Sequence, residues 1–451
     1  MPVAMHSFLP KLAQRSVPRY TSYPTAAEFG AGTGAREQSA ALDAVRPGAP
    51  VSLYVHIPYC REICWYCGCN TGAVGRPGRL DAYLDALLAE ARSVGVRMRG
   101  RITSVHFGGG SPNAVSPDQF RRLAQALRDS FNIAPDAEWA AELDPRGLDA
   151  DMARALADGG ITRASLGAQT FAPHIQVRIN RIQPFRDVAR AAADLRAAGI
   201  ARLNLDLMYG LPAQSLNDIA ATVSQALTLA PDRIAMFGYA HMPRMLPRQR
   251  MIDASLLPDA EARFWQSALA HDLLVDAGFQ AIGFDHFARP DDAIAIAARE
   301  GRLRRNFQGF TDDACTTLVG LGASSISQFD DLLVQNEKNV GRYRMLALNG
   351  VPTGVRGIQR TADDRLRAEL IERLLCDGSV DIAAVAAAHR RPVHAFFNAR
   401  LALEDLAREG IVALDGWTVR ILPEGRPYAR LAAVVFDTYR TAPPTGFSRA
   451  V

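Results

Sequence analysis

Short runs of β-branched and other apolar residues alternate along the chain with longer amphipathic stretches. Six of the short runs have strand character; they span residues 51–58, 102–110, 138–145, 161–170, 201–210 and 232–241. Between them, apolar residues recur at helical spacing, as in 80–94, 117–131, 184–199 and 215–230. Strands that alternate with helices predict a parallel sheet with right-handed crossovers. We therefore expect an α/β fold of six strand–helix units that close, or partly close, into a barrel.

The alternation becomes less regular after residue 241. Further strands are predicted in 279–288 and 316–329, and a helix in 258–278. From about residue 350 the pattern predicts helices near 363–376, 381–389 and 393–410, a β-hairpin over 410–425 and a final helix. Helices followed by a hairpin favour a small, mostly helical winged-helix-like domain. Because no basic recognition helix is visible, we interpret this domain as a lid or packing module rather than a DNA-binding unit.

Three parts are expected from these patterns. They are an N-terminal segment, 1–48, that packs near the active site, a catalytic domain, 49–350, and a helical C-terminal domain, 351–451. The chain of 451 residues is 48% hydrophobic and 22% charged, which is typical of a globular protein with more than one core. No apolar run approaches the roughly 20 residues of a membrane span, and prolines and charges interrupt the N-terminus. We expect a cytoplasmic protein without a membrane span.

The net charge and the lysine content argue against two classes of protein, nucleic-acid-binding proteins and enzymes with a lysine-tethered cofactor. The formal net charge of +4 is small for this length, and the basic residues are spread along the chain, which argues against a nucleic-acid partner. Lys11 and Lys338 are the only lysines among the 51 basic residues. A cofactor tethered to lysine is therefore disfavoured.

Four of the six cysteines lie in "YCREICWYCGCN", directly after the first predicted strand. In a reducing compartment, such a cluster indicates metal binding or catalysis rather than disulfides. Cys60, Cys64 and Cys67 have the spacing C-x3-C-x2-C, so only one C-x2-C pair of the kind common in zinc sites is present, and zinc would have to recruit Cys69 or a histidine. Three thiolates on an iron–sulfur cubane would instead leave one iron without a protein ligand. Both interpretations stay open at this point.

Polar and glycine-rich motifs occupy the ends of the six predicted strands. The motifs are HIPYC, HFGGGSP, ELDP, GAQT, DLMYG and GYAH. In a barrel of parallel strands, the carboxyl ends meet on one face, and functional groups gather there. We therefore expect one active site that combines these motifs with the cysteine loop.

The cysteine spacing after the first strand of a partial (β/α)6 barrel resembles the radical S-adenosylmethionine (SAM) enzymes. The resemblance implies a [4Fe-4S] cluster whose fourth iron is chelated by the amino and carboxylate groups of SAM. It also implies that one electron from the cluster splits the sulfonium into methionine and a 5′-deoxyadenosyl radical.

Further stretches of sequence narrow the resemblance to one family within the radical SAM enzymes. PRYTSYPTA at 18–26, CGCN at 67–70, LGAQTF, NLDLMYGLP, GFDHFARPDD, RRNFQGFT and VFDTYR together resemble the oxygen-independent coproporphyrinogen III oxidase, or coproporphyrinogen dehydrogenase, family of haem biosynthesis. The resemblance implies oxidative decarboxylation of two propionates of coproporphyrinogen III to vinyl groups, which gives protoporphyrinogen IX. A flavodoxin- or ferredoxin-type protein is expected as the electron donor, and the chain is expected to be a monomer.

The resemblance also implies roles for individual residues. Cys60, Cys64 and Cys67 become cluster ligands, whereas Cys69 is a fourth cysteine that is not a ligand. The alternative, in which Cys69 closes the cluster, stays open. The family holds two SAM molecules; by position, Tyr54, Gly109, Glu142 and Ile326 match contacts to the first, and Tyr66, Gly110, Ser111, Gln169, Arg181, Asp206 and Ala240 match contacts to the second. For Arg181 and Asp206, a salt bridge at the barrel mouth is the alternative.

Substrate contacts are the least defined part of the prediction. Cys69 and His56 are candidate catalytic residues, and Phe307 and Gln308 are candidate substrate contacts, although a histidine on an apolar strand is often a core residue. Candidate partners for the propionates are Arg19, Arg244, Arg289 and Arg305.

A related haem-binding, chaperone-like protein is the rival interpretation. That relative lacks the cysteine matching Cys69, the PRYTSYPT-like leader and the NFQGFT-like stretch. All three are present here, which favours the enzyme.

Overall fold

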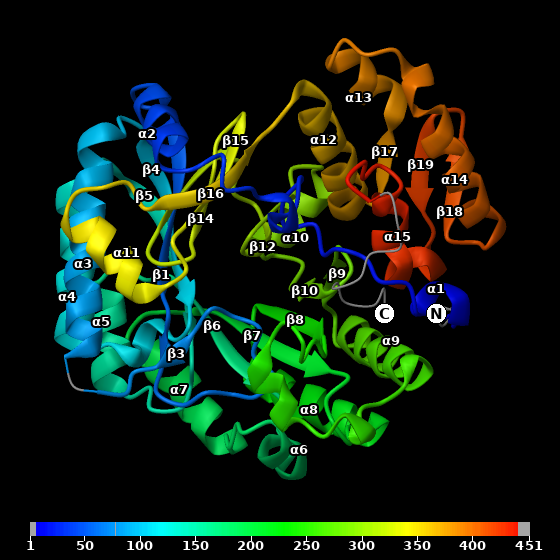
Figure 1. Ribbon diagram of the computed structural model, residues 1–451. Helices are drawn as coiled ribbons and strands as arrows, with labels where there is room; N and C mark the ends of the chain where they lie inside the picture. The colour runs from blue at the N-terminus through cyan, green and yellow to red at the C-terminus, as the bar shows by residue number, and fades with distance from the viewer. Residues whose placement is uncertain (1–5, 77, 441–451) are drawn as a thin grey trace.

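A twelve-stranded sheet forms the centre of the molecule (Figure 1). The computed structural model describes residues 6–76 and 78–440. Seven adjacent strands of the sheet are parallel, which includes all six predicted strands. In spatial order they are β13 (Thr317–Leu321), β1 (Pro50–Ile57), β4 (Arg101–Gly109), β5 (Ile133–Leu143), β6 (Arg163–Gln169), β7 (Arg202–Tyr209) and β8 (Arg233–Gly238).

Antiparallel strands extend the sheet at both ends. β10 (His286–Ala288) and β9 (Gln280–Ile282) follow β8, whereas β14 (Ile326–Gln328), β15 (Leu332–Asn336) and β16 (Gly354–Gln359) follow β13. The edge strands β9 and β16 do not pair with each other, so the barrel is partial, as expected. β16 belongs to this sheet although it lies beyond residue 350.

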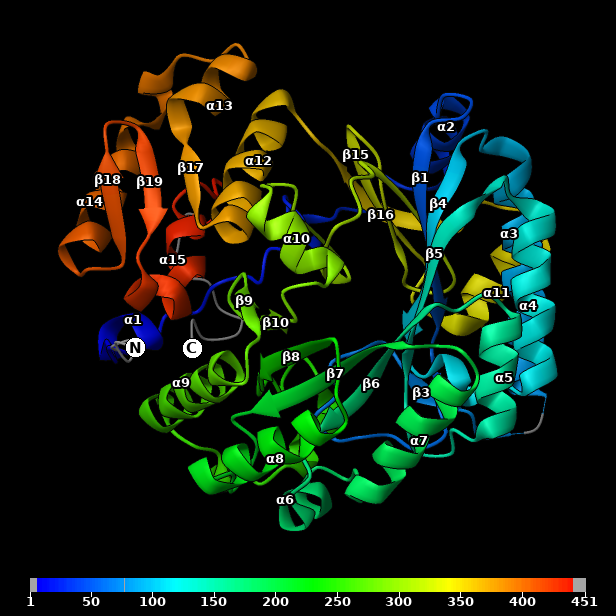
Figure 2. The ribbon, with the colours of Figure 1, turned by 180° about the vertical axis from the view of Figure 1, so that it is seen from behind.

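Helices cover the outer face of the parallel strands (Figures 1 and 2). These are α3 (Arg79–Arg97), α4 (Pro117–Ser130), α5 (Ala150–Asp158), α7 (Phe185–Ala197) and α8 (Leu216–Thr228). In α4, Phe120, Leu123 and Leu127 recur at helical spacing and are buried, and the Ser116 hydroxyl accepts a hydrogen bond from the backbone N–H of Gln119 at the start of the helix. The outer layer therefore follows from amphipathic periodicity and capping.

Among the described residues, six shorter or more peripheral helices, one small parallel strand pair and one small antiparallel pair complete the main body. The helices are α1 (Pro10–Ala13), α2 (Ala35–Ala44), α6 (Pro173–Arg178), α9 (Ala260–Asp276), α10 (Ala293–Arg299) and α11 (Val340–Leu348). The pairs are β2 (Tyr59–Cys60) with β3 (Gly72–Ala73), and β11 (Arg304–Asn306) with β12 (Gly309–Thr311). None of the described helices combines the length and the apolar character that a membrane crossing requires.

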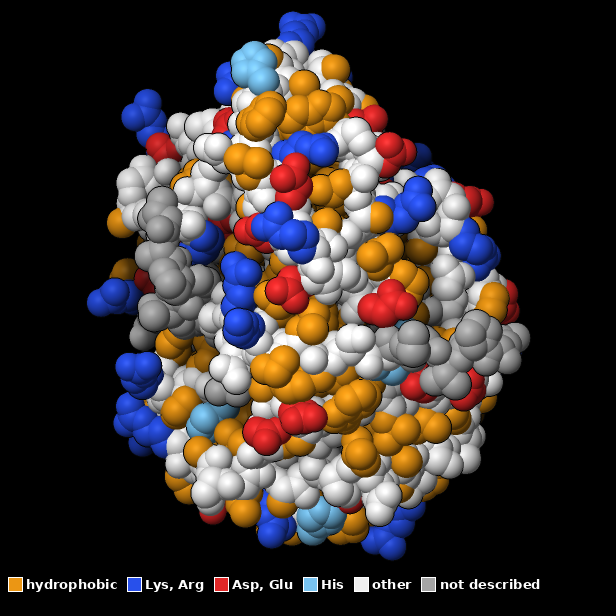
Figure 3. Space-filling model, turned by 90° about the vertical axis from the view of Figure 1, so that its right-hand side faces the viewer, with side chains coloured by type: hydrophobic (Ala, Val, Ile, Leu, Met, Phe, Trp, Pro, Cys, Tyr) orange, Lys and Arg blue, Asp and Glu red, His pale blue; other side chains and the backbone are white. Residues whose placement is uncertain are grey.

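The C-terminal unit packs around a second core, which it shares with the N-terminal segment and α9, and its helices and hairpin follow in the predicted order. It contains α12 (Ala362–Asp377), β17 (Ser379–Asp381), α13 (Ile382–Ala388), α14 (Phe397–Arg408), β18 (Val412–Asp415), β19 (Thr418–Ile421) and α15 (Ala429–Val434). The helix predicted over 393–410 is instead a 3-10 turn, Val393–Phe396, followed by α14. On the face that this unit forms with α9, the visible acidic, basic and hydrophobic side chains are interspersed (Figure 3).

The N-terminal segment connects the C-terminal unit to the edge of the large sheet. The Tyr20 hydroxyl donates to the Asp437 carboxylate at 2.9 Å, and Arg356 on β16 donates to the backbone carbonyl of Ala26 at 2.6 Å. Near the start of the described chain, His6 Nε2 lies 2.7 Å from Asp272 Oδ1 on α9. The segment is therefore fixed at several points between the two bodies.

A buried carboxylate on α3 organises the loop that follows β13. Glu90 is buried and accepts four hydrogen bonds, from the Tyr343 and Thr353 hydroxyls, the Asn336 amide and the backbone N–H of Gly322. Burial raises the pKa of Glu90, and the four donors offset part of that rise. Only an acceptor can satisfy this set of donors.

The same loop connects to the first strand through a tyrosine. The Tyr83 hydroxyl donates to the His56 carbonyl at 2.7 Å and accepts from the backbone N–H of Ala323 at 3.1 Å. The carboxyl end of β1 is thereby tied to the loop that Glu90 holds. Because the cysteine loop begins directly after β1, this network supports it from behind.

We predict that Glu90→Gln lowers the free energy of unfolding by about 3 kcal/mol, because an amide NH2 would face groups that are themselves donors. Urea denaturation measures the change. Asp85→Asn, an exposed position on the same helix that pairs with Arg122, is the matched control and should change the free energy of unfolding by less than about 1 kcal/mol. An equally small effect at Glu90 would contradict the assigned role of the network.

Candidate functional site

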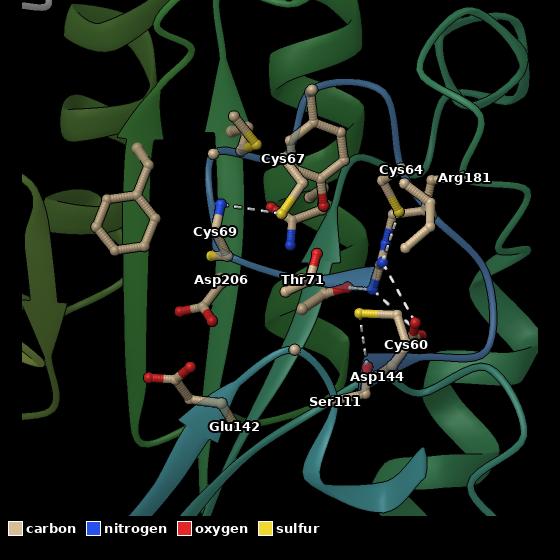
Figure 4. A pocket seen from close by; sticks show the side chains of 18 of the residues that line it. Cys60, Cys64, Cys67, Cys69, Thr71, Ser111, Glu142, Asp144, Arg181 and Asp206 are labelled. Carbon is tan, nitrogen blue, oxygen red and sulfur yellow. Dashed lines mark hydrogen bonds and ion pairs between the residues drawn. The ribbon is translucent and has the colours of Figure 1, made fainter. Parts of the chain in front are cut away.

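A cavity of about 520 Å³ opens at the carboxyl ends of the parallel strands. Its lining combines the cysteine loop with residues that follow β4, β5, β6, β7 and β8. Figure 4 shows the labelled side chains that converge there. The strand-end motifs therefore meet on one face, as expected for parallel strands.

The cysteine loop is held at both ends by backbone hydrogen bonds. Gly72 N–H donates to the Pro58 carbonyl at 2.9 Å, and Val74 N–H donates to the Cys60 carbonyl at 3.0 Å, which closes the β2–β3 pair. Between these anchors, the sulfurs of Cys60, Cys64 and Cys67 border one space in Figure 4. The loop thus presents three thiols from one short, closed segment.

The spread of the sulfur atoms separates the two metal interpretations. In a tetrahedral zinc site with Zn–S bonds of about 2.3 Å, ligand sulfurs lie about 3.8 Å apart. All four cysteines of the loop are described, and no three of them have sulfurs within 4.8 Å of one another. The donor set is therefore too wide for a single zinc ion and fits a larger, polynuclear group such as an iron–sulfur cluster.

Positive charge and hydrogen-bond donors surround the thiols. Arg181 Nη1 and Arg146 Nη2 lie 3.3 and 3.4 Å from Cys64 Sγ. The side chain and the backbone N–H of Cys69 hydrogen-bond to Cys67 Sγ and, despite burial, lower the pKa of Cys67 to about 6. Burial raises the pKa of Cys60 to about 11. The donors around Cys67 favour a thiolate there, whereas burial disfavours one at Cys60 until a metal binds; three thiols around one space fit the cluster that the resemblance implies.

Arg181 pairs with a carboxylate other than the predicted one. Its Nη2 lies 3.3 Å from Asp144 Oδ1 and donates to the Gly167 carbonyl at 2.6 Å. No ion pair joins it to Asp206 in the described residues, so the suggested salt bridge between these two is wrong. Arg181 Nε is buried and has no hydrogen-bond partner among the described residues. The guanidinium therefore keeps one donor for a bound ligand.

The two acidic residues deeper in the cavity differ in their environment. Burial raises the pKa of Asp206 to about 6, and the Ser165 hydroxyl and the Asn204 amide hydrogen-bond to its carboxylate. Burial also disfavours the charge on Glu142, but His106, at 3.1 Å, lowers the pKa of this carboxyl overall. Glu142 is therefore the more readily ionised of the two.

The glycines after β4 allow the backbone to approach the cysteine loop. Gly109 has a φ of +108°, and a Cβ there would lie 2.5 Å from the His56 ring. A Cβ on Gly110 would lie 2.5 Å from the Tyr59 carbonyl oxygen. Larger residues would push the β4 loop away from the cysteines, so glycine is required for packing as well as for ligand access.

A bulge directs Gln169 at the end of β6. The register between β6 and β7 shifts between Gly167 and Gln169, and Gln169 has a φ of +61°. Bulges of this kind commonly redirect a side chain next to a functional site. Gln169 lines the cavity as a result.

Most of the predicted site residues line the cavity. They are Cys60, Cys64, Tyr66, Cys67, Cys69, Gly109, Gly110, Ser111, Glu142, Gln169, Arg181, Asp206 and Ala240. Five others, Tyr54, His56, Phe307, Gln308 and Ile326, do not. Of these five, Tyr54 and His56 lie on β1, and the other three lie on β14 and in the turn between β11 and β12.

Tyr54 and His56 lie behind the glycine loop. The Tyr54 hydroxyl is 3.1 Å from His56 Nδ1, and the Tyr54 ring packs against the rings of both His56 and His106. His56 is 7% exposed, and burial lowers its pKa to about 4. A buried, neutral ring against Gly109 agrees with the core-residue alternative for His56, which then supports the site from behind.

Phe307 and Gln308 form the turn between β11 and β12, and Ile326 begins β14. Gln308 Nε2 is buried without a hydrogen-bond partner among the described residues. The carbonyl of Ile326 would lie 2.7 Å from a Cβ added to Gly320, so this strand packs closely against β13. Phe307 and Gln308 thus belong to the separate β11–β12 hairpin, and only Ile326 lies in the antiparallel part of the large sheet.

The four candidate arginines separate into two pairs. Arg19 lines the cavity and donates to the Gly238 carbonyl at 2.7 Å, and Arg305 donates to the Arg19 carbonyl through Nε and Nη2. Arg244 is exposed, and Arg289 is an exposed residue whose Nε lies 3.6 Å from Asp291. Of the four, only Arg19 lines the cavity, and Arg305 contacts the Arg19 backbone without lining it.

Sequence reasoning missed three residues that shape the site. Arg146, next to the ELDP motif, contacts Cys64 and Asp144, and its position beside a quoted motif was the available signal. Arg248 donates to the Thr71 carbonyl, and Gln249 donates to the carbonyls of Tyr66 and Ala240. Nothing in the local pattern distinguishes Arg248 and Gln249 from other polar loop residues.

Comparison with known families agrees with this geometry. The model of the radical SAM superfamily matches residues 54–226, and the model of the HemN C-terminal domain matches residues 361–428. The first match contains the cysteine loop and the strands β1 to β7. The second coincides with the C-terminal unit.

Similar proteins match over nearly the whole chain. A protein of Bradyrhizobium diazoefficiens named oxygen-independent coproporphyrinogen III oxidase is 42% identical over 97% of this chain and 98% of its own length, and one of Escherichia coli with the same name is 38% identical over 97% and 96%. The solved structure of the coproporphyrinogen III oxidase of Escherichia coli, described as a radical SAM enzyme, covers 93% of this chain and 97% of its own with a TM-score of 0.90 and 36% identity. The chain therefore belongs to the oxygen-independent coproporphyrinogen III oxidase family of the radical SAM superfamily.

Proposed function

We propose that the chain converts coproporphyrinogen III to protoporphyrinogen IX without oxygen, by oxidative decarboxylation of two propionates to vinyl groups. The observation that carries this proposal is the set of three thiols, Cys60, Cys64 and Cys67, which border one space beside a cavity and are too widely spaced for a single zinc ion. The near-complete match to relatives with this name supports the same reaction. We place the enzyme in the cytoplasm, as a monomer.

Cys60, Cys64 and Cys67 would hold the [4Fe-4S] cluster, and two SAM molecules would bind beside it. When bound, these groups supply the radical that removes a hydrogen atom from the substrate. Arg181, with its unpartnered Nε, suits a SAM carboxylate, and Asp206 suits a ribose hydroxyl or an ammonium group. Cys69 leaves the fourth coordination position open in this proposal.

The remaining lining residues favour a dry cavity. Met208, Phe237, Tyr239 and Leu246 contribute apolar surface opposite the carboxylates. Exclusion of water limits side reactions, and close packing fixes which carbon of the substrate faces the reactive position. No general acid or base is needed to break a C–H bond homolytically, so positioning is the main task of this chain.

Arg19 and Arg305 are the proposed partners for substrate propionates. Arg19 reaches the cavity, where its guanidinium lies over Phe237, and Arg305 Nη1 is buried without a hydrogen-bond partner among the described residues. Burial lowers the pKa of Arg305, and the nearby charge of Arg19 lowers it further. An anionic group bound between them would relieve this unfavourable arrangement.

The three features that distinguish the enzyme from the haem-binding relative all lie in described parts of the structure. Cys69 lines the cavity, the leader at 18–26 crosses beside it with Arg19 inside, and the stretch 306–311 forms the β11–β12 turn and strand. The first two contribute to the cavity lining, whereas the described lining contains no residue of 306–311. They favour the oxidase over the haem-binding alternative.

The experiment that tests the function is anaerobic incubation of the cluster-loaded protein with SAM, a reductant and coproporphyrinogen III. We expect two 5′-deoxyadenosine and two CO2 molecules for each divinyl product, since two propionates react. Chromatography of the porphyrins after oxidation measures the product. Cleavage of SAM with no loss of CO2 from coproporphyrinogen III would contradict the proposed substrate.

A variant of Arg19 tests the substrate contact. We predict that Arg19→Gln raises the KM for coproporphyrinogen III at least about tenfold, because a charge-assisted hydrogen bond is lost, while substrate-free SAM cleavage stays within about twofold. Arg19→Lys should recover part of the loss.

Arg289→Gln is the matched control and should leave the KM unchanged, since Arg289 is exposed outside the cavity. The proposed role of Arg19 fails if both glutamine variants have the KM of the unaltered chain.

A further inference from the structure

Three surface segments meet around the cysteine loop. Residues 61–71 form the loop itself, and residues 177–182 and 244–253 flank it. Trp65 N–H donates to the Ile179 carbonyl at 3.0 Å, Asn180 Nδ2 donates to the Ile63 carbonyl at 2.8 Å, and Gln249 Nε2 donates to the Tyr66 carbonyl at 2.9 Å. These contacts join the segments into one surface, which we name the cysteine-loop rim.

The cysteine-loop rim is strongly basic. Apart from Arg181, which is buried in the cavity, it contains five arginines and two carboxylates, namely Arg61, Arg178, Arg244, Arg248, Arg250, Glu62 and Asp253. The side chains of the rim that are not buried therefore carry a net charge of +3. Four of the arginines, at 61, 178, 244 and 250, are exposed. Such a surface attracts an acidic partner over several ångströms.

Large apolar side chains are exposed among these arginines. Val177, Ile182, Met245 and Met251 have exposed fractions of 62%, 55%, 62% and 60%. Exposed apolar residues rimmed by polar ones mark interaction surfaces, and methionine and arginine are enriched in protein interfaces. A basic face that only contacts water does not need exposed methionine side chains. The combination therefore favours a binding surface.

The rim also lies directly over the proposed redox centre. Asn180 holds the backbone next to Cys64, and Arg248 holds Thr71 near the other end of the cysteine loop. Of the two cysteines outside the loop, Cys376 is buried and Cys315 stands alone beside Thr103, and the described residues contain no second cluster of thiols. Electrons for the centre must therefore come from another molecule.

We propose that the cysteine-loop rim is the docking surface for an acidic, one-electron carrier protein of the flavodoxin or ferredoxin type. The proposal rests on the proposed function, because that function requires an electron at the cluster. Each docking event moves one electron, which oxidises the carrier by one electron and reduces the bound centre by one. A second copy of this chain is a poorer occupant, since two rims of charge +3 would repel each other.

A pair of charge reversals tests the docking surface. In the cluster-loaded protein, Arg178→Glu with Arg250→Glu should raise the KM for reduced flavodoxin at least about tenfold and reduce its dependence on salt. With dithionite as the reductant, which needs no docking surface, SAM cleavage should stay within about twofold. The matched control is Arg391→Glu with Arg420→Glu, two exposed arginines of the C-terminal unit, which should leave the KM for flavodoxin unchanged.

Calorimetric titration with oxidised flavodoxin measures docking apart from turnover. We expect binding to the unaltered and control proteins and at least tenfold weaker binding to the rim variant. Equal affinity in all three, or an unaltered KM for flavodoxin in the rim variant, would overturn the proposal. So would a dimer in analytical ultracentrifugation that the rim variant abolishes, because the rim would then be an interface between copies of this chain.

The same titration tests the docking surface independently of the proposed function. If coproporphyrinogen III is not decarboxylated even with dithionite, the proposed function fails, while the titration still decides whether the rim binds the carrier.

Discussion

The whole site depends on one constraint: a loop of ten residues, Cys60 to Cys69, must hold three thiols around one space and leave a fourth side open. A single zinc ion would draw its sulfur ligands to within about 3.8 Å of one another. The loop instead spreads Cys60, Cys64 and Cys67 more widely, and its ends are fixed by the β2–β3 pair. This wide spacing of the three sulfurs is the observation that favours a polynuclear cluster over a single zinc ion.

The rest of the fold serves to fix that loop in place. The glycines after β4 press against His56 and Tyr59, so the first two strand ends are packed without a gap. Behind them, Tyr83 connects the β1 end to the loop that Glu90 organises from α3. A rigid support of this kind is what positioning in radical chemistry requires, since the reactive atom must face one carbon only.

Arginines surround the cysteine loop both inside the cavity and on the protein surface. Arg181 and Arg146 hydrogen-bond to Cys64 Sγ inside the cavity, whereas the exposed arginines of the cysteine-loop rim face the solvent. The N-terminal leader brings Arg19 into the cavity from the side of the C-terminal unit. One short loop thus separates a substrate-facing cavity from a surface suited to an electron donor.

Periodicity predicted the parallel strands and their helices because these elements are long and amphipathic, as in α4. The short strands β15 and β16 were missed because neither has an alternating pattern: β15 is buried along its whole length, and the edge strand β16 carries two glycines and an arginine. The residue positions of the cavity followed from the family motifs at the strand ends. The pairing of Arg181 with Asp144 and the position of His56 behind Gly109 did not, because they are set by strand register and side-chain packing.

The most direct test of the central claim is electron paramagnetic resonance of the reduced cluster, with and without SAM, in the unaltered chain and in Cys64→Ala and Cys69→Ala. The account predicts that the unaltered chain and Cys69→Ala retain iron and sulfide and change their spectra when SAM is added, whereas Cys64→Ala loses the cluster. Equal loss of iron in both variants, or an intact cluster whose spectrum ignores SAM, would contradict it.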